Sequence, residues 1–476
     1  MTNYNKVLKE VLNFIRPKPE EKRKLESLAK KVLALTKKEA KKINAKAILA
    51  GSITRDTWVS DKMEFDVFVL FSPKLKEKRM EELGLKLGKK VINQLKGQYV
   101  IEYAEHPYVS GSVSGIDIDI VPCFEISSPE NLKSAVDRTP FHVRYIEKNL
   151  SFKLSDEVRL LKQFLKTLEA YGADAKTEGF SGYVCELLVI KYKKFVNVLQ
   201  SAVNWKPGEI IDIEKYYPKS DYPKLKRQFK NQVSILIDPT DKKRNTTAAL
   251  SSRNFFKFKK YAKEFLEKPS SNLFFPKKLE ILTEDELIKL QMQRRTELIL
   301  VKLTPSKVVP DILWPQLRRF AERLQSILEE VKYEFKVLRK AIYTDEKDLA
   351  VVLLEMEVSK LPTVQKRIGP SIFDLEDSKN FIKKYKDQAL AGPYTESNFW
   401  VVEVRRKFLT AREKLLDSLN ESFEILTAKG IPNHIAKQIT KDFEIISETI
   451  KIMELIKKDN DFGVFLRRHF EKESLI

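Results

Sequence analysis

EFDVFVLF at residues 64–71 and IDIDIV at residues 116–121 decide the fold of the N-terminal part of this chain. Both stretches are rich in Val, Ile and Phe, and both predict β-strands. Because residues i and i+2 of a strand point to the same face, Glu64 and Asp66 lie side by side, about 7 Å apart along the backbone. Asp117 and Asp119 form a second such pair. Acidic residues are depleted in strands, so two acidic pairs on otherwise apolar strands favour a functional site.

Carboxylates that converge on one sheet face repel each other unless cations lie between them. Magnesium prefers carboxylates together with phosphate oxygens. Two such ions about 3.5–4 Å apart would stabilise the attacking and leaving oxygens of a phosphoryl transfer. The strand period places Asp117 and Asp119 on the same face, so the pattern alone leaves open which one is the third ligand. The alternative interpretation is that these carboxylates are ordinary acidic residues on the solvent-exposed face of a half-buried strand.

Further motifs follow in order from about residue 50 to about residue 400. They are GSITR (51–55), EFDVF (64–68), HPYV (106–109), DIVPC (119–123), TPFH (139–142), RLLK (159–162), GFSGYVCEL (179–187), DPTDKKRN (238–245), LWPQLRR (313–319) and RIGP (367–370). With these motifs the sequence resembles the nucleotidyltransferase superfamily that includes DNA polymerase β, and within it most closely the archaeal CCA-adding enzymes, which are tRNA nucleotidyltransferases.

The carboxylates and the Gly-Ser turn would also fit poly(A) polymerases and oligoadenylate synthetases. The stretches at 179–187 and 238–245 favour the CCA-adding enzymes. That resemblance implies template-independent addition of C, C and A to the tRNA 3′ end from CTP and ATP, with release of pyrophosphate. The alternative from another class is a non-catalytic RNA-binding protein whose nucleotidyltransferase head has lost its catalytic residues. The intact Glu64, Asp66 and Asp119 argue against such a loss.

The resemblance implies that Glu64, Asp66 and Asp119 hold two magnesium ions. It selects Asp119 over Asp117 because the family's carboxylate stands just before the Val-Pro-Cys run, here separated from it by Ile120. It also implies six nucleotide-binding residues, which are Ser52, Arg55, His142, Lys162, Tyr171 and Arg244.

Among these six residues, Arg55 and Lys162 carry charges that suit the triphosphate. The donors of Arg244 suit the ring nitrogen and carbonyl of cytosine, and the ring nitrogens of adenine offer further acceptors. Without the resemblance, Arg55 would be assigned to an ion pair with Asp56 or Asp61. His142 would be a histidine at a helix end, and Tyr171 a core residue whose hydroxyl reaches solvent.

A chain of 476 residues is expected to hold two to four domains. We predict an α+β multidomain protein whose nucleotidyltransferase head, with a mixed sheet and helices, spans residues 1–150. A helical neck at 151–275 completes the nucleotide pocket. An α/β, ferredoxin-like body follows at 276–403, and a helical tail at 404–476 contacts tRNA.

Local patterns predict several element boundaries. Ser155 is expected to cap the first neck helix, because Asp156 and Glu157 suit the positive end of a helix. One helix is expected over 183–203. The body is expected to follow the order strand, helix, strand, strand over 298–303, 314–331, 333–343 and 349–358.

A formal net charge of +21 and a pI of about 9.5 favour a polyanionic partner. The resemblance implies tRNA, bound at its acceptor stem and elbow, and leaves a homodimer open. No apolar run has transmembrane length and no signal-peptide pattern follows Met1, so we expect a cytoplasmic protein without a membrane partner. Cys123 and Cys185 fall in apolar runs and are expected to be buried free thiols.

Overall fold

The computed structural model describes residues 4–60, 62–103, 105–275, 279–331, 333–472 and 474–475. It divides into two compact units. The first comprises Met1–Lys278 with Ser474–Ile476, and the second comprises Leu279–Glu473. The predicted boundaries at residues 150, 275 and 403 remain a prediction, and residue 276 lies outside the described residues.

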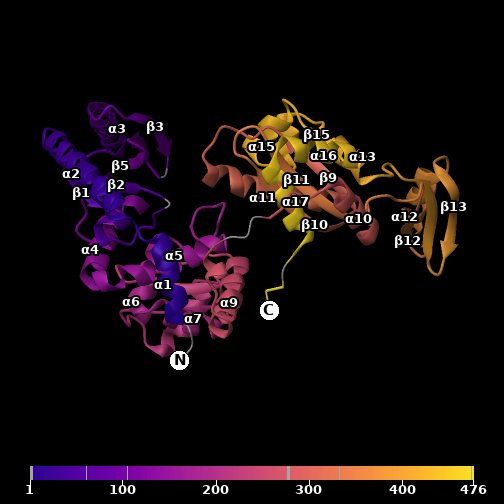
Figure 1. The fold of residues 1–476 in the computed structure, drawn as a ribbon. Helices are drawn as coiled ribbons and strands as arrows, with labels where there is room; N and C mark the ends of the chain where they lie inside the picture. Colours follow the sequence, from indigo (N-terminus) through magenta and orange to yellow (C-terminus); the bar gives the residue numbers. More distant parts are fainter. Residues whose placement is uncertain are drawn as a thin grey trace. The chain divides into compact units, whose positions relative to one another are not determined.

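A five-stranded mixed sheet organises the N-terminal part of the first unit (Figure 1). Its central strands β2 and β5 are parallel, and the other pairings are antiparallel. The strand order is β1 (Lys46–Ala50), β2 (Glu64–Phe71), β5 (Ile116–Phe124), β4 (Pro107–Val113) and β3 (Gln98–Tyr103). The predicted mixed sheet is therefore present.

Two helices, α2 (Pro19–Lys41) and α3 (Glu77–Gln94), cover one face of this sheet. Every second residue of β2, beginning with Phe65 and Val67, packs into the same apolar core as these helices. Strand alternation sends Glu64 and Asp66 to the opposite face. The helices thus leave the acidic face free of their apolar side chains.

The rest of the first unit is mainly helical. One apolar core joins most of its helices and is crowded with phenylalanine side chains, among them Phe164, Phe195 and Phe258. The helices are α1 (Tyr4–Ile15), α4 (Thr139–Asn149), α5 (Ser155–Thr167), α6 (Gly182–Tyr192), α7 (Phe195–Val203), α8 (Tyr222–Gln228) and α9 (Ser252–Glu267). A small sheet of β6 (Glu209–Ile211), β7 (Ser234–Asp238) and β8 (Asp241–Asn245) accompanies them.

Two local predictions for these helices are wrong. Ser155 is not a cap but the first residue of α5, and its buried hydroxyl donates to the carbonyl of Arg55 at 3.0 Å. The helix predicted over 183–203 is two helices, because Lys193 adopts a φ of +69° and ends α6. Residues 183–203 contain no Gly or Pro that would have marked this break in the sequence.

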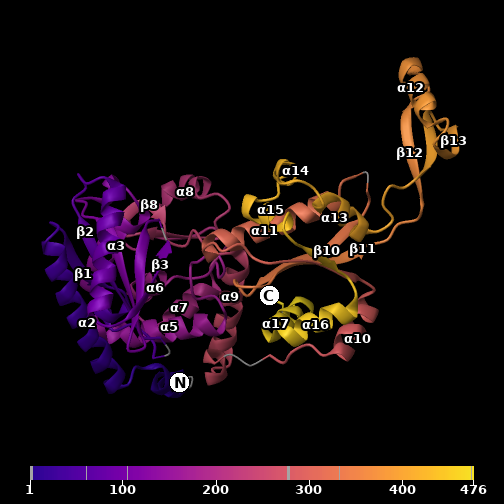
Figure 2. The ribbon, with the colours of Figure 1, turned by 90° about the horizontal axis from the view of Figure 1, so that it is seen from above.

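A four-stranded antiparallel sheet forms the centre of the second unit (Figure 2). Helix α11 (Pro310–Leu328) covers one face, and α10 (Glu284–Arg294), α16 (Thr449–Lys458) and α17 (Asn460–Phe470) cover the other. The strand order is β10 (Lys336–Thr344), β11 (Ala350–Val358), β9 (Glu297–Leu303) and β15 (Glu444–Ile446). In chain order this is 2-3-1-4, the arrangement of the predicted ferredoxin-like body.

The predicted tail differs from an all-helical segment at two places. Val404 and Arg405 end strand β14, and Glu444–Ile446 form β15, which pairs with β9 at the edge of the body sheet. The remaining helices are α13 (Ala411–Leu419), α14 (Phe423–Ala428) and α15 (Asn433–Ile439). A separate three-stranded sheet consists of β12 (Val364–Ser371), β14 (Phe399–Arg405) and β13 (Ala389–Glu396), with α12 (Leu375–Tyr385) beside it.

Cys123 and Cys185 are buried free thiols, as predicted. Among the described residues, no helix has both the length and the apolar character needed to cross a bilayer.

Candidate active site

The parallel pairing of β2 with β5 brings the two acidic pairs together. Its register aligns Glu64 with Asp117 and Asp66 with Asp119. Neighbouring strands lie about 4.8 Å apart. The four side chains share the sheet face opposite α2 and α3, so the structure places all of them where the strand period predicts.

The electrostatics of this cluster show an excess of negative charge. Burial, followed by the charges of Asp119 and Glu64, raises the pKa of Asp66 to about 7. Burial also raises the pKa of Asp119, against a hydrogen bond from Ser110 that lowers it. Burial alone raises the pKa of a carboxylate, and for Asp66 the like charges of Asp119 and Glu64 add to this rise against the opposing charges of Arg55 and Lys62.

Lys62 supplies one positive charge to the cluster. Its ammonium pairs with Glu64. Burial acts to lower the pKa of Lys62, but Glu64, Asp117 and Asp119 outweigh burial and raise it. The cluster therefore attracts a cation, and its oxygen ligands are of the kind that magnesium prefers.

The two candidate third ligands differ in their surroundings. Asp117 is exposed, and its backbone N–H donates to the carbonyl of Met63 at 3.1 Å. Asp119 is partly buried, is hydrogen-bonded to Ser110, and contributes to the raised pKa of Asp66. Asp119 is thus the more strongly coupled to Asp66.

The Gly51-Ser52 turn lies directly against the carboxylates. Gly51 has a φ of +83°, and a Cβ placed on it would lie 3.0 Å from Oδ2 of Asp66. The position needs glycine for both reasons. Ser52 opens a short 3-10 helix, Ser52–Arg55, that follows the turn.

Arg55 does not pair with Asp56, one of the two aspartates that its sequence context suggested. Its Nε donates to Glu186 at 3.0 Å, and Glu186 is almost fully buried in α6. Asp56 instead pairs with Lys22 and Arg159. Asp61 lies outside the described residues.

Lys162 joins the same buried group. Its ammonium donates to the carbonyl of Thr57 at 3.1 Å and to Oγ1 of Thr57 at 3.4 Å, while that hydroxyl donates to Glu186 at 2.8 Å. Burial lowers the pKa of Lys162, and Glu186 partly offsets this. Arg55 binds the carboxylate of Glu186 directly, and Lys162 reaches it through the Thr57 hydroxyl, so two basic side chains gather at one carboxylate in an arrangement suited to a phosphate.

The side chains of Tyr171 and Lys162 both lie against Gly182, the first residue of α6. A Cβ placed on Gly182 would lie 3.1 Å from the Tyr171 hydroxyl and 3.8 Å from the Lys162 ammonium. The ammonium of Lys166 lies 5.6 Å from the centre of the Tyr171 ring. The structure therefore brings Tyr171 and Lys162 together around a glycine.

His142 and Arg244 meet at Asp238. Nε2 of His142 lies 2.9 Å from Asp238 Oδ2, and Nη1 of Arg244 donates to the same oxygen at 2.8 Å. The His142 ring stacks on Tyr183 with centroids 4.0 Å apart. Two residues 102 positions apart in the sequence, from α4 and β8, thus share one carboxylate.

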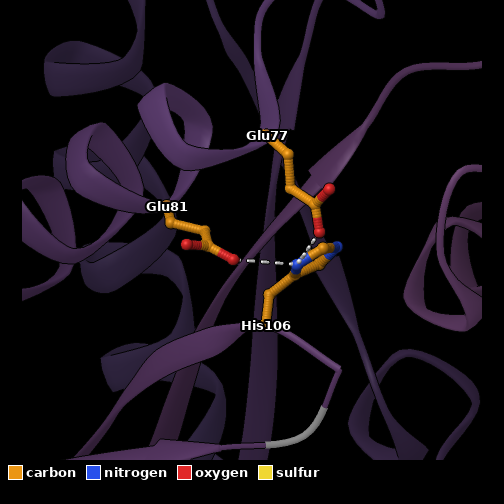
Figure 3. Close-up of side chains that lie close together, drawn as sticks. All are labelled: Glu77, Glu81 and His106. Atoms are coloured by element: carbon orange, nitrogen blue, oxygen red, sulfur yellow. Dashed lines mark hydrogen bonds and ion pairs between the residues drawn. The ribbon is translucent and has the colours of Figure 1, made fainter.

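A second acidic group lies on α3 and the chain before β4 (Figure 3). Nδ1 of His106 lies 3.2 Å from Glu81 and 3.3 Å from Glu77, and the His106 side chain is 3% exposed. Glu77 and Glu81 are one helical turn apart, so both reach the same ring nitrogen. The three side chains tie the start of β4 to α3, and their ligand atoms lie within 4.8 Å of one another.

Comparisons with known proteins agree with this geometry. The sequence profile described as "Nucleotidyltransferase domain" matches residues 29–142, which contain the Gly-Ser turn and the carboxylates. Two further profiles, "tRNA nucleotidyltransferase, second domain" and "CCA-adding enzyme, C-terminal domain", match residues 156–275 and 294–448. The fold and the site together define a nucleotidyltransferase.

Three archaeal proteins described as CCA-adding enzymes are similar over most of their length. The protein of Methanocaldococcus jannaschii is 39% identical, and the match covers 80% of this chain and 84% of that protein. That of Methanosarcina acetivorans is 35% identical and covers 96% of both chains. The protein of Archaeoglobus fulgidus is 33% identical, and the match covers 93% of this chain and 94% of that protein. The chain belongs to the CCA-adding enzyme family, and the resemblance inferred from its motifs is confirmed.

Sequence reasoning assigned no role to Lys62, Glu186 or Asp238. Glu186 stands alone among apolar residues from Val184 to Ile190, and Asp238 ends the apolar strand SILID. A single acidic residue in a fully buried segment needs a partner. That signal could have marked both residues, although it does not identify their partners.

Proposed function

We propose that this protein adds C, C and A in turn to the 3′ end of tRNA, with CTP and ATP as substrates and pyrophosphate as product. The observation that carries the proposal is the alignment of Asp66 with Asp119 beside Glu64, in a chain whose relatives are named CCA-adding enzymes. The surplus negative charge of these residues supports a role in metal-assisted nucleotidyl transfer.

Glu64, Asp66 and Asp119 would hold two magnesium ions. When bound, the two ions would lower the pKa of the tRNA 3′-hydroxyl and neutralise charge on the β- and γ-phosphates and the leaving pyrophosphate. Gly51 lets the backbone approach Asp66 closely, and Ser52 follows it with a hydroxyl and an N–H for the triphosphate.

Arg55 and Lys162 would neutralise triphosphate charge. Their support is the buried group around Glu186, whose carboxylate Arg55 contacts directly and Lys162 contacts through the Thr57 hydroxyl. Tyr171 would line the nucleotide pocket beside Lys162. The pocket would thus combine residues of the predicted head and neck.

Arg244 would meet the edge of the incoming base, and His142 would bind the nucleotide beside it. The guanidinium presents donors that suit the acceptors of cytosine and adenine. Arg244→Ala should reduce the preference for C and A over U and G. Unchanged base selectivity would exclude this role.

The positive balance of the chain supports binding of tRNA at its acceptor stem and elbow. RNA helices are recognised mainly through shape, phosphates and 2′-hydroxyls. Affinity should fall steeply with salt as counterions are released. An affinity that stays flat between low and moderate salt would remove this support.

The test is extension of tRNAs that end at successive points short of CCA, with CTP and ATP supplied alone and together. We expect CTP alone to extend the tRNA that lacks CCA by two nucleotides, and ATP alone to extend only the tRNA that ends in CC. An enzyme that ignores CTP is a poly(A) polymerase or an oligoadenylate synthetase-like enzyme. One that binds tRNA but no nucleotide in magnesium is a non-catalytic RNA-binding protein.

A further inference from the structure

Asp238 is a carboxylate with no exposed surface at the end of β7. Its Oδ1 accepts hydrogen bonds from Oη of Tyr183 at 3.1 Å and from both N and Oγ1 of Thr240 at 2.9 Å. Its Oδ2 accepts from Arg244 at 2.8 Å and lies 2.9 Å from Nε2 of His142. Both oxygens are thus surrounded by donors.

These donors keep Asp238 ionised. Burial acts to raise its pKa, but the hydrogen bond and charge of His142, the backbone of Thr240 and the charge of Arg244 outweigh burial and lower the pKa well below its ordinary value. An ionised carboxylate only accepts hydrogen bonds. Nε2 of His142 must therefore carry the hydrogen of the contact.

We propose that Asp238 is a positioning residue for nucleotide selection, which fixes the orientations of Arg244 and His142 before the nucleotide binds. The inference rests on the proposed function, in which those two residues contact the nucleotide. Asp238 itself has no exposed surface for contact with the base.

The two positioned side chains come from different elements and are held at defined atoms. The His142 ring is held at Nε2 by Asp238 and on its face by Tyr183. Arg244 is bound at Nη1, and its side chain is 34% exposed. Its other donors make no hydrogen bond to any residue that the structure describes, so they are available to a base edge.

A carboxylate is the side chain that this arrangement requires. An asparagine has the same shape, but one of its two terminal atoms is an NH₂ donor. In one orientation that NH₂ would face Arg244 and His142, and in the other it would face Tyr183 and Thr240. Either way, donors would oppose donors, and Arg244 would lose its charged partner.

The test compares kcat/KM for single-nucleotide addition of CTP and UTP to tRNA lacking CCA, and of ATP and GTP to tRNA ending in CC. For Asp238→Asn we expect both preference ratios to fall about tenfold, mainly through a higher KM for CTP and ATP. Asp241→Asn is the matched control. It removes a charge from the same hairpin, where Asp241 pairs with Arg138 at 3.6 Å, and should leave the ratios unchanged.

A merely structural role would lower all four kcat/KM values together and preserve the ratios, and that result would overturn the inference. In an Arg244→Ala background, Asp238→Asn should change the ratios less than about twofold, because the positioned side chain that meets the base edge is already gone. A full additive loss would also overturn it. If the unmodified enzyme itself shows no preference for CTP and ATP, the proposed function fails instead.

Tyr183→Phe tests the same inference if Asp238→Asn does not fold. This variant keeps the ring that stacks on His142 and removes one donor to Asp238. We expect the preference ratios to fall about threefold. Unchanged ratios in a folded Tyr183→Phe enzyme would contradict the positioning role.

Discussion

Asp66 in the head and Glu355 in the body are both carboxylates on sheet strands, and their pKa values move in opposite directions. Burial and the neighbouring Asp119 and Glu64 raise the pKa of Asp66 to about 7. Burial acts on Glu355 in the same sense, but hydrogen bonds from His469, Arg294 and Thr296 outweigh it and lower the pKa to about 2.

The difference lies in what surrounds each carboxylate. Glu355 accepts from Arg294 at 2.6 Å and from Thr296 at 2.8 Å, and it lies 3.0 Å from His469 and 3.3 Å from Arg339. Its charge is fully compensated by the protein, so it serves the fold by tying α10 and α17 to β11. Asp66 lacks such compensation, which is the state expected of a residue that binds a cation.

The largest expected effect separates activity at these two sites. Asp66→Ala should reduce the rate of nucleotide addition by about 10³-fold, because a metal ligand stabilises charge in the transition state by several kcal/mol. Glu355→Ala should change the rate per folded molecule by less than about threefold. Single-turnover addition of CTP to tRNA lacking CCA measures both rates. Similar losses of rate in the two variants would contradict the functional difference between Asp66 and Glu355.

The stability of the fold should be affected more by the change at Glu355 than by the change at Asp66. Glu355→Ala leaves Arg294 and His469 without their buried partner, and breaking a buried ion pair costs about 3–5 kcal/mol. Urea unfolding of the full chain at pH 7 measures this cost. A midpoint equal to that of the unmodified protein would show that the Glu355 network does not hold the body together.

The contribution of Glu355 should depend on pH in a defined direction. Its pKa is lower in the folded state, so its stabilisation is complete above its unfolded pKa of about 4.5 and is lost as the pH falls towards about 2. The difference in unfolding free energy between the unmodified protein and Glu355→Gln should therefore shrink by about half between pH 6 and pH 3. A difference that grows on acidification would have the wrong sign.

The smallest expected effect concerns Asp66. Asp66→Asn removes a charge that Glu64 and Asp119 repel, so at pH 8 and in the presence of chelator the variant should melt about 2 °C higher than the unmodified protein. Glu77→Gln, an exposed member of the His106 group, serves as a control for removal of a head carboxylate and should not raise the melting temperature. A lower melting temperature for Asp66→Asn would mean that its charge is already compensated.

Strand alternation and motif order predicted much of the fold. The period of two placed Glu64 and Asp66 on one face, and apolar runs located the ferredoxin-like body. These patterns did not predict changes of backbone direction at single residues, as the positive φ of Lys193 shows. So did the addition of β15 to the body sheet, because a three-residue strand carries almost no periodicity.

The candidate site could be predicted as a set of residues but not as a network. Arg55 and Lys162 were predicted from the resemblance, whereas the contacts of Arg55 and Thr57 with Glu186 depend on packing between segments over 120 residues apart in the sequence. The same holds for Asp238, which meets His142 across 96 residues. The fold determines these long-range partners, and the apolar sequence around Glu186 and Asp238 shows only that each carboxylate needs one.

The most direct test of the account compares Asp119→Ala with Asp117→Ala in the tRNA extension assay with CTP and ATP. The two residues share a strand face, and Asp119 lies opposite Asp66 in the register while Asp117 lies opposite Glu64. We predict loss of addition by about 10³-fold for Asp119→Ala and near-normal addition for Asp117→Ala. Near-normal turnover of Asp119→Ala together with an inactive Asp117→Ala would contradict the assignment.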